Sequence, residues 1–425
     1  MKRHEMQVVS RASGSVRVPG SKSLTLRSIV CGALASGESV LENALISSDS
    51  VGLAAAFRAA GLSVEVDEAA RRFVCRGDGR APRAESPTPL DVADCGTCMR
   101  FAVALCAAGE GEWTLDGTSR MRERPIGGLV RALEPHAGAM EYLGGPGCPP
   151  LRMRATGLDG GRFDVDASES SQYVSALLLA APLARGPVEV RPLGSFPSRP
   201  YVDLTLQTMA AFGIDVASDG ECFRISPGTY VGRPHSIEGD WSSASYFLAA
   251  AAITGGEVEV EGVRGDSRQG DRRFVDFLEA LGCRHEPTEN GVRLIGASRP
   301  GDVTFDFGDC PDVVPTAAIA AAFHPGRVSI TGAPHLRLKE SDRIAVVCDQ
   351  LRRLGASAEE RDDGMVIEGG HPLTGAEIDT HDDHRIAMSF AIAGLRVPGV
   401  VLLDPDCTSK SYPGFFEDLD RLAGA

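Results

Sequence analysis

The sequence predicts an α/β protein of six similar repeats, which we expect to divide between two lobes of three repeats each. Along the 425 residues, an Ala- and Leu-rich helical segment, a glycine and then an alternating strand recur. These junction glycines form two interleaved sets, and neighbours within a set lie roughly 70 to 77 residues apart, which is typical of a repeat architecture. The first set is Gly37, Gly111, Gly186, Gly256, Gly326 and Gly399, and the second is Gly61, Gly138, Gly213, Gly282, Gly355 and Gly424.

The junctions also predict the elements inside each repeat. Glycine suits the position just past a helix because it adopts the left-handed backbone conformation without a Cβ clash. The strand after Gly256 alternates Val258 and Val260 with glutamates, as a half-buried strand does. The segment Ser243–Ile253 is apolar nearly all round, which predicts a helix buried on every side. We therefore expect buried helices with sheets outside them.

Six repeats of this size exceed the usual growth of one hydrophobic core, so three repeats in each of two lobes is the natural division. The polypeptide is expected to cross between lobes near Pro19-Gly20-Ser21 and near Glu238-Gly239-Asp240. One lobe then contains residues 1–20 and 239–425, with both termini, and the inserted lobe contains residues 21–238.

Composition excludes several classes of function. A net charge of −15 argues against binding to nucleic acid or to an anionic membrane, because both need a basic face. We find no signal peptide and no apolar run long enough to cross a bilayer. The 11 cysteines are scattered, as expected of reduced thiols in a cytoplasm. The pair Cys95 and Cys98 lacks the second pair or nearby histidine that a zinc site would need.

The distribution of cations predicts an anion site. Among 43 basic residues the only lysines are Lys2, Lys22, Lys339 and Lys410, and the last three lie in polar segments where helices are expected to start. Free N–H groups at helix starts bind anions, although the same residues are also ordinary N-caps. Arginine pairs with phosphate and carboxylate in bidentate fashion, so a ligand with several negative charges is expected. The cations beside these segments are Lys22, Arg27, Arg100, Arg124, Lys339, Arg343, Arg385 and Lys410.

Short motifs along nearly the whole chain resemble those of one enzyme family. In chain order they are PGSKS from Pro19, GTCMR from Gly96, RMRERPI from Arg120, SSQ from Ser170, SRPY from Ser198, EGDWSSASY from Glu238, LKESDR from Leu338, DDHR from Asp382 and CTSKSYP from Cys407. This set resembles the EPSP synthase (3-phosphoshikimate 1-carboxyvinyltransferase) family of enolpyruvyl transferases. The resemblance implies two lobes, each of three βαβαββ units in an inside-out α/β barrel-like arrangement.

The resemblance also implies an activity: transfer of the 1-carboxyvinyl group of phosphoenolpyruvate to the 5-hydroxyl of shikimate 3-phosphate, with release of phosphate. The reaction passes through a tetrahedral intermediate and belongs to chorismate and aromatic amino acid biosynthesis. Family members use no metal or cofactor and are usually monomers. The two lobes are expected to close over the substrates. Gly96 leaves room beside the phosphoenolpyruvate site, so inhibition by glyphosate is expected.

The motifs carry the family's site residues onto this chain. The residues implied for shikimate 3-phosphate are Lys22, Ser23, Arg27, Ser170, Ser171, Gln172, Ser198, Tyr201, Asp312, His335 and Lys339. Those implied for phosphoenolpyruvate are Lys22, Gly96, Arg124, Gln172, Arg343, His384, Arg385 and Lys410.

The chemistry requires the same residue types. A weak alcohol nucleophile needs a base, and C3 of the enol needs a proton donor, for which Asp312 and Glu340 are the candidates. Lys22 and Lys410 would neutralise charge without a metal. Two alternatives stay open: Asp312 as a simple cap of a helix over Val313–Phe323, and Glu340 as a residue of a helix first turn.

Two positions depart from the family pattern. Asp94 stands where an asparagine is common and would repel a carboxylate unless it faces Arg100 or Arg124. His335 stands where an asparagine often contacts the substrate phosphate, and it could donate a hydrogen bond in its place.

Two other functions compete with this one. The sister family transfers the same group to UDP-N-acetylglucosamine with a reactive cysteine or aspartate on a loop, and the corresponding segment Glu110–Arg124 contains Asp116 but no cysteine. A non-catalytic binder of phosphorylated acids would bind to saturation without turnover.

Overall fold

The computed structural model describes residues 2–424, which divide into two compact units. Unit 1 combines the chain up to Gly20 with the segment from Glu238 onward, and unit 2 is Ser21–Ile237. Glu238 therefore belongs to unit 1 and not to the inserted lobe. Its carboxylate Oε1 accepts hydrogen bonds from Ser267 at 2.6 Å and from Gln269 at 2.8 Å, both in unit 1.

Unit 2 contains three four-stranded sheets within its described residues, in the strand orders β14-β3-β5-β4, β6-β7-β9-β8 and β10-β11-β13-β12. In each sheet the first two strands are parallel and the other pairings are antiparallel. The strands are β3 (Ser36–Glu42), β4 (Ser63–Asp67), β5 (Arg72–Asp78), β6 (Thr88–Asp91), β7 (Glu110–Asp116), β8 (Gly138–Tyr142), β9 (Leu151–Thr156), β10 (Gly161–Asp166), β11 (Val188–Leu193), β12 (Ala217–Ser218), β13 (Phe223–Ile225) and β14 (Pro234–Ser236).

The helices of unit 2 complete the predicted βαβαββ order. They are α1 (Lys22–Leu34), α2 (Ser48–Ala59), α3 (Gly96–Ala108), α4 (Gly127–Ala137), α5 (Ser171–Ala180) and α6 (Arg199–Ala211), with the short 3-10 helices η1 (Met121–Glu123) and η2 (Ala181–Leu183). The repeat β6-α3-β7-α4-β8-β9 is continuous in the chain. The repeat that starts with α1 takes its first strand, β14, from the other end of unit 2, so the chain closes this unit on itself.

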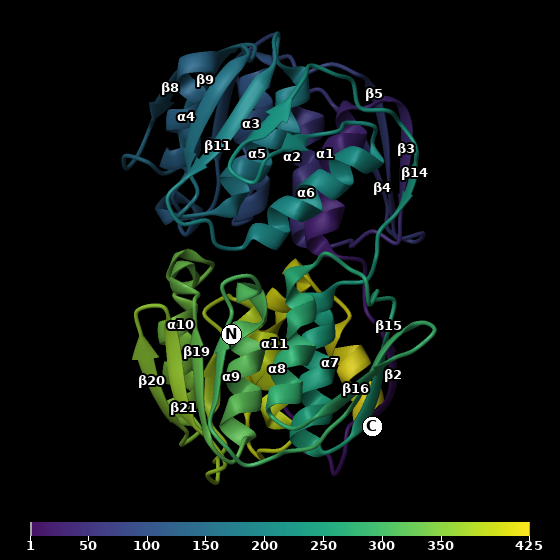
Figure 1. Ribbon diagram of the computed structural model, residues 1–425, viewed down its shortest axis with the longest axis vertical. Helices are drawn as coiled ribbons and strands as arrows, with labels where there is room; N and C mark the ends of the chain where they lie inside the picture. The colour runs from purple at the N-terminus through teal and green to yellow at the C-terminus, as the bar shows by residue number, and fades with distance from the viewer. Residues whose placement is uncertain (1, 425) are drawn as a thin grey trace. The chain divides into compact units, whose positions relative to one another are not determined.

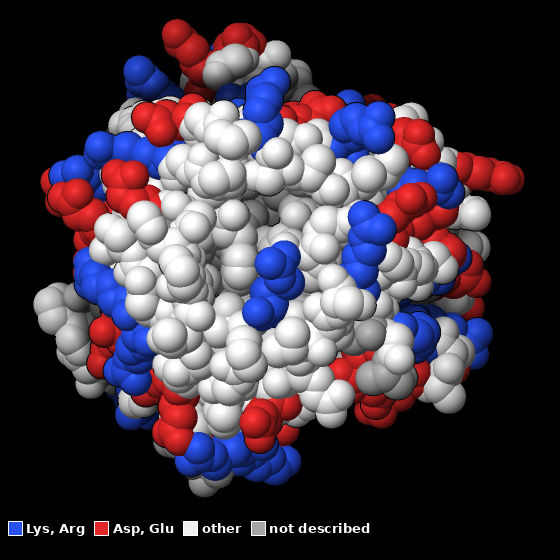
Figure 2. All heavy atoms as spheres, turned by 90° about the horizontal axis from the view of Figure 1, so that it is seen from below, with Lys and Arg blue, Asp and Glu red and all other residues white. Residues whose placement is uncertain are grey.

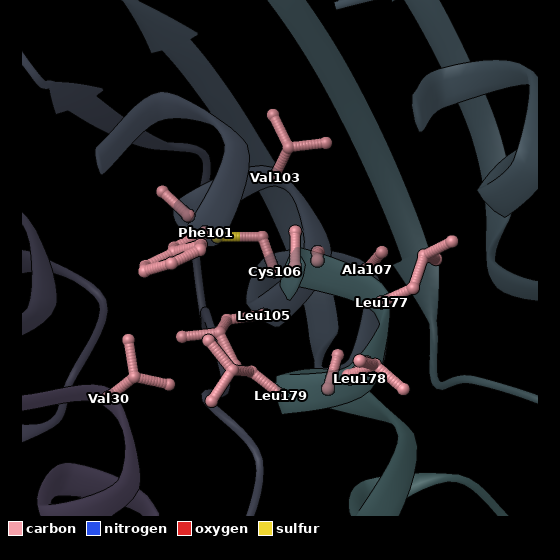
Figure 3. Packing of buried hydrophobic residues seen from close by; sticks show 14 of the residues in the cluster. Val30, Phe101, Val103, Leu105, Cys106, Ala107, Leu177, Leu178 and Leu179 are labelled. Atoms are coloured by element: carbon pink, nitrogen blue, oxygen red, sulfur yellow. The ribbon is translucent and has the colours of Figure 1, made fainter. Parts of the chain in front are cut away.

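The core of unit 2 forms around α1, α3 and α5, with the labelled sheets on either side of the helices in Figure 1. Figure 3 shows Val30 of α1, Phe101 and Leu105 of α3 and Leu179 of α5 packed together. Helix α3 is buried nearly all round because its residues are mostly Ala, Val, Leu, Cys and Phe. Burying one such large side chain stabilises the fold by about 1.5 to 3 kcal/mol.

Unit 1 repeats this architecture with one difference. Its described residues form the sheets β16-β17-β15-β2 and β18-β19-β21-β20 and a three-stranded sheet β1-β23-β22. In the last of these, the N-terminal strand β1 pairs antiparallel with β23, where the other repeats use a local hairpin. The strands are β1 (Arg3–Glu5), β2 (Ser13–Arg17), β15 (Glu257–Glu261), β16 (Arg284–Pro287), β17 (Gly291–Ile295), β18 (Val303–Asp306), β19 (Arg327–Thr331), β20 (Ser357–Arg361), β21 (Gly364–Glu368), β22 (Glu377–Asp379) and β23 (Val401–Leu403).

The helices of unit 1 lie between these sheets in Figure 1. Helix α7 covers the predicted segment and is buried along almost its whole length, which confirms the expected buried helix. The helices are α7 (Trp241–Thr254), α8 (Phe274–Ala280), α9 (Val314–Phe323), α10 (Arg343–Arg353), α11 (His384–Gly394) and α12 (Phe415–Ala423), with the 3-10 helices η3 (Gly270–Arg273), η4 (Pro311–Val313), η5 (Pro334–Leu338) and η6 (Pro405–Lys410).

The junction glycines behave differently in the two sets. All six of the second set have a positive φ, between 73° and 110°, as predicted for residues just past a helix. In the first set, Gly37, Gly111 and Gly399 have a positive φ, but Gly186, Gly256 and Gly326 do not. Gly256 is required for another reason: a Cβ there would lie 1.8 Å from the carbonyl oxygen of Ala12, so only glycine lets the two backbones approach.

The charge on one face of the molecule agrees with the net charge of −15. On the face that Figure 2 shows, mostly uncharged residues surround a central hollow, isolated basic side chains stand among them, and acidic and basic side chains mix around the border. This face therefore offers no continuous basic surface for a nucleic acid. Among residues 2–424, no helix is both long and apolar enough to cross a membrane.

Candidate active site

In unit 2 the predicted residues gather at the starts of buried helices. Helix α3 begins at Gly96 and is capped by Cys95, whose Sγ accepts a hydrogen bond from the backbone N–H of Cys98 at 3.3 Å. Helix α5 begins at Ser171, and Ser170 Oγ accepts from Gln172 N at 3.2 Å. The cysteine pair thus has a local structural role in starting α3.

Gly96 lies against two guanidinium groups. A Cβ at this position would lie 2.5 Å from Nη1 of Arg100 and 2.5 Å from Nη2 of Arg124. Both arginines are almost fully buried, at 3% and 5% exposure. A side chain larger than hydrogen at position 96 would therefore displace them.

Arg100 has fewer hydrogen bonds than a buried guanidinium normally makes. Its Nη2 donates to the carbonyl of Pro125 at 2.6 Å, but within residues 2–424 its Nε and Nη1 have no acceptor. Burial, and then the charge of Arg124, lowers the pKa of Arg100 to about 10. Buried N–H donors without acceptors destabilise a protein unless a ligand supplies the acceptors. The buried pair Arg100 and Arg124 is therefore suited to bind an anion. The predicted site contains Arg124 but lacks Arg100, although the GTCMR motif includes it.

Lys22 makes a buried ion pair that the sequence did not suggest. Its Nζ lies 3.2 Å from Oδ2 of Asp49, a buried residue in the first turn of α2. Nearby, Gln172 Nε2 donates to Thr97 Oγ1 at 3.0 Å, which connects the first turns of α5 and α3. Lys22 is therefore held by a carboxylate, and Gln172 by a hydroxyl.

Arg27 mainly binds protein groups. Its Nε donates to Thr205 Oγ1 at 2.8 Å, and its Nη1 donates to the carbonyl of Ser23 at 2.9 Å. Its Nη2 donates to the carbonyl of Tyr201 at 2.8 Å and to Ser175 Oγ at 3.4 Å. Burial lowers the pKa of Arg27 to about 10. These contacts use four of the five N–H groups of a guanidinium, so one remains for a ligand.

Ser198 has a strained backbone. It precedes α6 with φ 59° and ψ 34°, in the left-handed region that residues other than glycine rarely adopt. Its carbonyl accepts from Tyr201 N at 3.1 Å. Strain of this kind occurs often at ligand sites, because the surrounding structure must hold the residue in place.

In unit 1, Arg343 joins three carboxylates. From the first turn of α10, its Nε donates to Asp383 Oδ2 at 2.8 Å, and its Nη2 donates to Glu340 Oε2 at 2.9 Å. Its Nη1 donates to Asp312 Oδ1 at 3.3 Å. The two predicted catalytic carboxylates are thus held by one guanidinium. Asp383, which the predicted site lacks, is fully buried and also caps α11.

A second arginine and a lysine complete this cluster. Arg385 Nη2 donates to Asp312 Oδ2 at 2.6 Å, so Asp312 is shared between two arginines. Lys410 Nζ lies 3.7 Å from Glu340 Oε1. Both carboxylates therefore face cations on two sides, an arrangement that stabilises negative charge.

Neither carboxylate is the N-cap residue of the helix that follows it. Asp312 lies in η4, and the N-cap of α9 is Val313. Glu340 precedes Asp342, the N-cap of α10, and so lies outside the helix first turn.

The two predicted histidines, His335 and His384, are both buried. Burial, and then the charge of Lys339, lowers the pKa of His335 to about 3, so this side chain is neutral at physiological pH. His384 is the first residue of α11, is fully buried, and has Nδ1 3.7 Å from Asp383 Oδ1.

Asp94 contacts Arg124 through its backbone. Arg124 Nη1 donates to the carbonyl oxygen of Asp94 at 2.9 Å. The carbonyl thus supplies an acceptor to Arg124 whatever the side chain at position 94. Asp116 is paired with Arg122, whose Nε and Nη2 lie 2.9 and 2.6 Å from its carboxylate oxygens.

The six repeats, with buried cations and paired carboxylates near helix starts, define a class of two-unit α/β enzymes for anionic substrates. The sequence matches the family model of EPSP synthase (3-phosphoshikimate 1-carboxyvinyltransferase) over residues 6–419. The chain belongs to this family, and its fold class is the one predicted.

Named relatives and solved structures agree. The chain is 40% identical to the 3-phosphoshikimate 1-carboxyvinyltransferase of Vibrio vulnificus, over 98% of both chains. It is 40% identical to that of Shewanella denitrificans, over 99% of both. A solved structure of EPSP synthase from Acinetobacter baumannii superposes with a TM-score of 0.81 at 30% identity, covering 99% of this chain and 98% of that one.

Proposed function

We propose that this protein transfers the 1-carboxyvinyl group of phosphoenolpyruvate to the 5-hydroxyl of shikimate 3-phosphate and releases phosphate. Membership of the family supports the reaction. The observation that carries the assignment of residues is the pair Asp312 and Glu340, which Arg343 holds at 3.3 and 2.9 Å. A reaction that needs one base and one acid requires two ionisable groups held in fixed positions, and two carboxyl groups can serve in these roles.

In the first step, Asp312 accepts the proton of the 5-hydroxyl as its oxygen bonds to C2 of phosphoenolpyruvate. Glu340 donates a proton to C3, which gives the tetrahedral intermediate. In the second step Glu340 takes a proton back from C3, the C2–C3 double bond forms again, the C2–O bond to phosphate breaks, and Asp312 gives its proton to the departing phosphate. Lys22 and Lys410 stabilise charge on the phosphate and carboxylate groups.

We assign the shikimate 3-phosphate site to Lys22, Ser23, Arg27, Ser170, Ser171, Gln172, Ser198, Tyr201, Asp312, His335 and Lys339. We assign the phosphoenolpyruvate site to Lys22, Gly96, Arg124, Gln172, Arg343, His384, Arg385 and Lys410, and the structure supports adding Arg100.

The partners are thus small molecules, and we propose that the protein acts as a cytoplasmic monomer. The scattered cysteines support the cytoplasmic location, and the monomeric state usual in the family supports the monomer.

Phosphorus NMR tests the function directly. The protein is mixed with phosphoenolpyruvate, with and without shikimate 3-phosphate. Inorganic phosphate and a new phosphoester signal that arise only with both substrates are the expected result. Phosphate release with UDP-N-acetylglucosamine in its place would assign the sister activity. Binding of both substrates without phosphate release would show a non-catalytic binder.

A further inference from the structure

Asp271 is a buried carboxyl group beside the Asp312–Arg385 pair, and it belongs to none of the motifs or sites described above. It lies in η3, immediately before α8, with 4% of its surface exposed. Aspartate is rarely buried to this degree without a specific partner.

Its partner is a hydroxyl that also contacts Arg385. Ser242 Oγ, in the first turn of α7, donates a hydrogen bond to Oδ2 of Asp271. The same Oγ accepts from Arg385 Nη2 at 3.3 Å, and that Nη2 donates to Asp312 at 2.6 Å. Since a hydroxyl carries a single hydrogen, pointing it at Asp271 turns the lone pairs of Ser242 toward Arg385.

The charges around Asp271 come from three neighbouring elements. Burial, and then the negative charge of Asp312 on η4, raises the pKa of Asp271 to about 7. Arg385 on α11 and the Ser242 hydrogen bond lower it, and Asp240 at the start of α7 raises it. On its own element, Arg273 pairs with Asp309 at 3.8 Å and stacks on Phe305.

We propose that Asp271 is a positioning residue: by orienting the Ser242 hydroxyl, it fixes the Arg385 guanidinium against Asp312. The inference rests on the proposed function, in which Arg385 binds phosphoenolpyruvate. A guanidinium binds a carboxylate or phosphate well only in a fixed orientation, because its donors form a planar fork. Loss of the Asp271 acceptor frees Ser242 to rotate and leaves Arg385 held by Asp312 and by Tyr246, whose hydroxyl lies 3.4 Å from Nη1.

The test compares wild type, Asp271→Ala, Ser242→Ala and the double variant. Each single substitution is expected to raise the KM for phosphoenolpyruvate about tenfold, the effect of losing one charge-assisted contact, and to leave the KM for shikimate 3-phosphate unchanged. Because both act through one contact, the double variant should also show about a tenfold change. Ser242→Thr, which retains the hydroxyl, should restore the wild-type KM. Asp276→Ala on exposed α8 surface is the matched control and should change neither value.

Three results would overturn the proposal. The first is an unchanged KM for phosphoenolpyruvate in Asp271→Ala. The second is a KM in the double variant that rises by the product of the two single effects. The third is a lower kcat and a lower melting temperature while both KM values stay the same. The last would show a purely structural role.

The proposed function is judged separately, on phosphate release by wild type. If wild type binds phosphoenolpyruvate without turnover, the proposed function fails. The role of Asp271 is then tested by calorimetry on the same variants, in which the dissociation constant for phosphoenolpyruvate should rise by the same factors as those expected for the KM. Absence of phosphoenolpyruvate binding by wild type would overturn both proposals.

Discussion

Replacing Gly96 by alanine tests the phosphoenolpyruvate site with one methyl group. The new Cβ would lie 2.5 Å from both Nη1 of Arg100 and Nη2 of Arg124. Carbon and nitrogen atoms in contact need about 3.5 Å, so the two guanidinium groups must each move by about 1 Å or change rotamer. Overpacking of a buried site typically costs about 1 to 3 kcal/mol.

If that free energy is lost from binding, the KM for phosphoenolpyruvate rises by about 5- to 150-fold. The KM for shikimate 3-phosphate should stay near the wild-type value. The assay is steady-state phosphate release, with each substrate varied in turn, together with melting temperatures to confirm that the variant is folded.

Gly52→Ala is the matched control, because Gly52 lies inside α2 and a Cβ there meets nothing within 4 Å. This control should keep wild-type kinetics and gain about 0.5 to 1 kcal/mol of stability. A wild-type KM for phosphoenolpyruvate in Gly96→Ala would refute the assignment of this pair of arginines to that substrate.

The remaining predictions concern the carboxylates, Arg100, pH and inhibition. Asp312→Asn and Glu340→Gln should each lower kcat by about 10² to 10⁴-fold with smaller changes in KM; turnover within tenfold of wild type would contradict their acid–base roles. Arg100→Gln should weaken phosphoenolpyruvate binding by about 10- to 100-fold in calorimetry, and an unchanged dissociation constant would exclude Arg100 from the site. Because the pKa of Asp271 is raised in the native state, between about pH 4 and 7 this carboxyl group is protonated in the native state and ionised in the unfolded state. The free energy of unfolding should therefore fall as pH rises through that range. Asp271→Asn should flatten this dependence, by up to about 3 kcal/mol between urea unfolding at pH 5 and at pH 8, and an equally steep dependence would argue against the shift. Glyphosate should compete with phosphoenolpyruvate, and an inhibition constant orders of magnitude above the KM would count against that prediction.

Much of the fold could be predicted because each repeat shows the same local residue preferences at its helix ends and buried faces. The second set of junction glycines marks helix ends, and all six adopt the left-handed conformation for which glycine is suited. Apolar residues on every face predicted that α7 is buried, and the structure confirms it. The sixth sheet was harder to predict: it takes its last strand, β1, from the other end of the chain, and local preference carries no information about that pairing.

The site residues remain predictions, but sequence motifs identified most of the buried charges. They did not identify Asp49 or Asp271. The DDHR and GTCMR motifs contain Asp383 and Arg100, but neither residue was assigned to the predicted site. Sequence spacing could not have found these contacts, because the partners lie far outside any one motif: Lys22 and Asp49 are 27 residues apart, Ser242 and Asp271 are 29 apart, and Arg343 and Asp383 are 40 apart.

The sequence by itself determined the repeat, the family and the residue types available for acid–base chemistry, because all three depend on local composition and on motif order. Only the tertiary structure decided which charges share a hydrogen bond. Folding brings together the starts of helices that the sequence separates, and burial then makes each contact strong because water no longer competes for it. That is why one arginine, Arg343, holds both predicted catalytic carboxylates while another, Arg100, keeps two donors without an acceptor among residues 2–424.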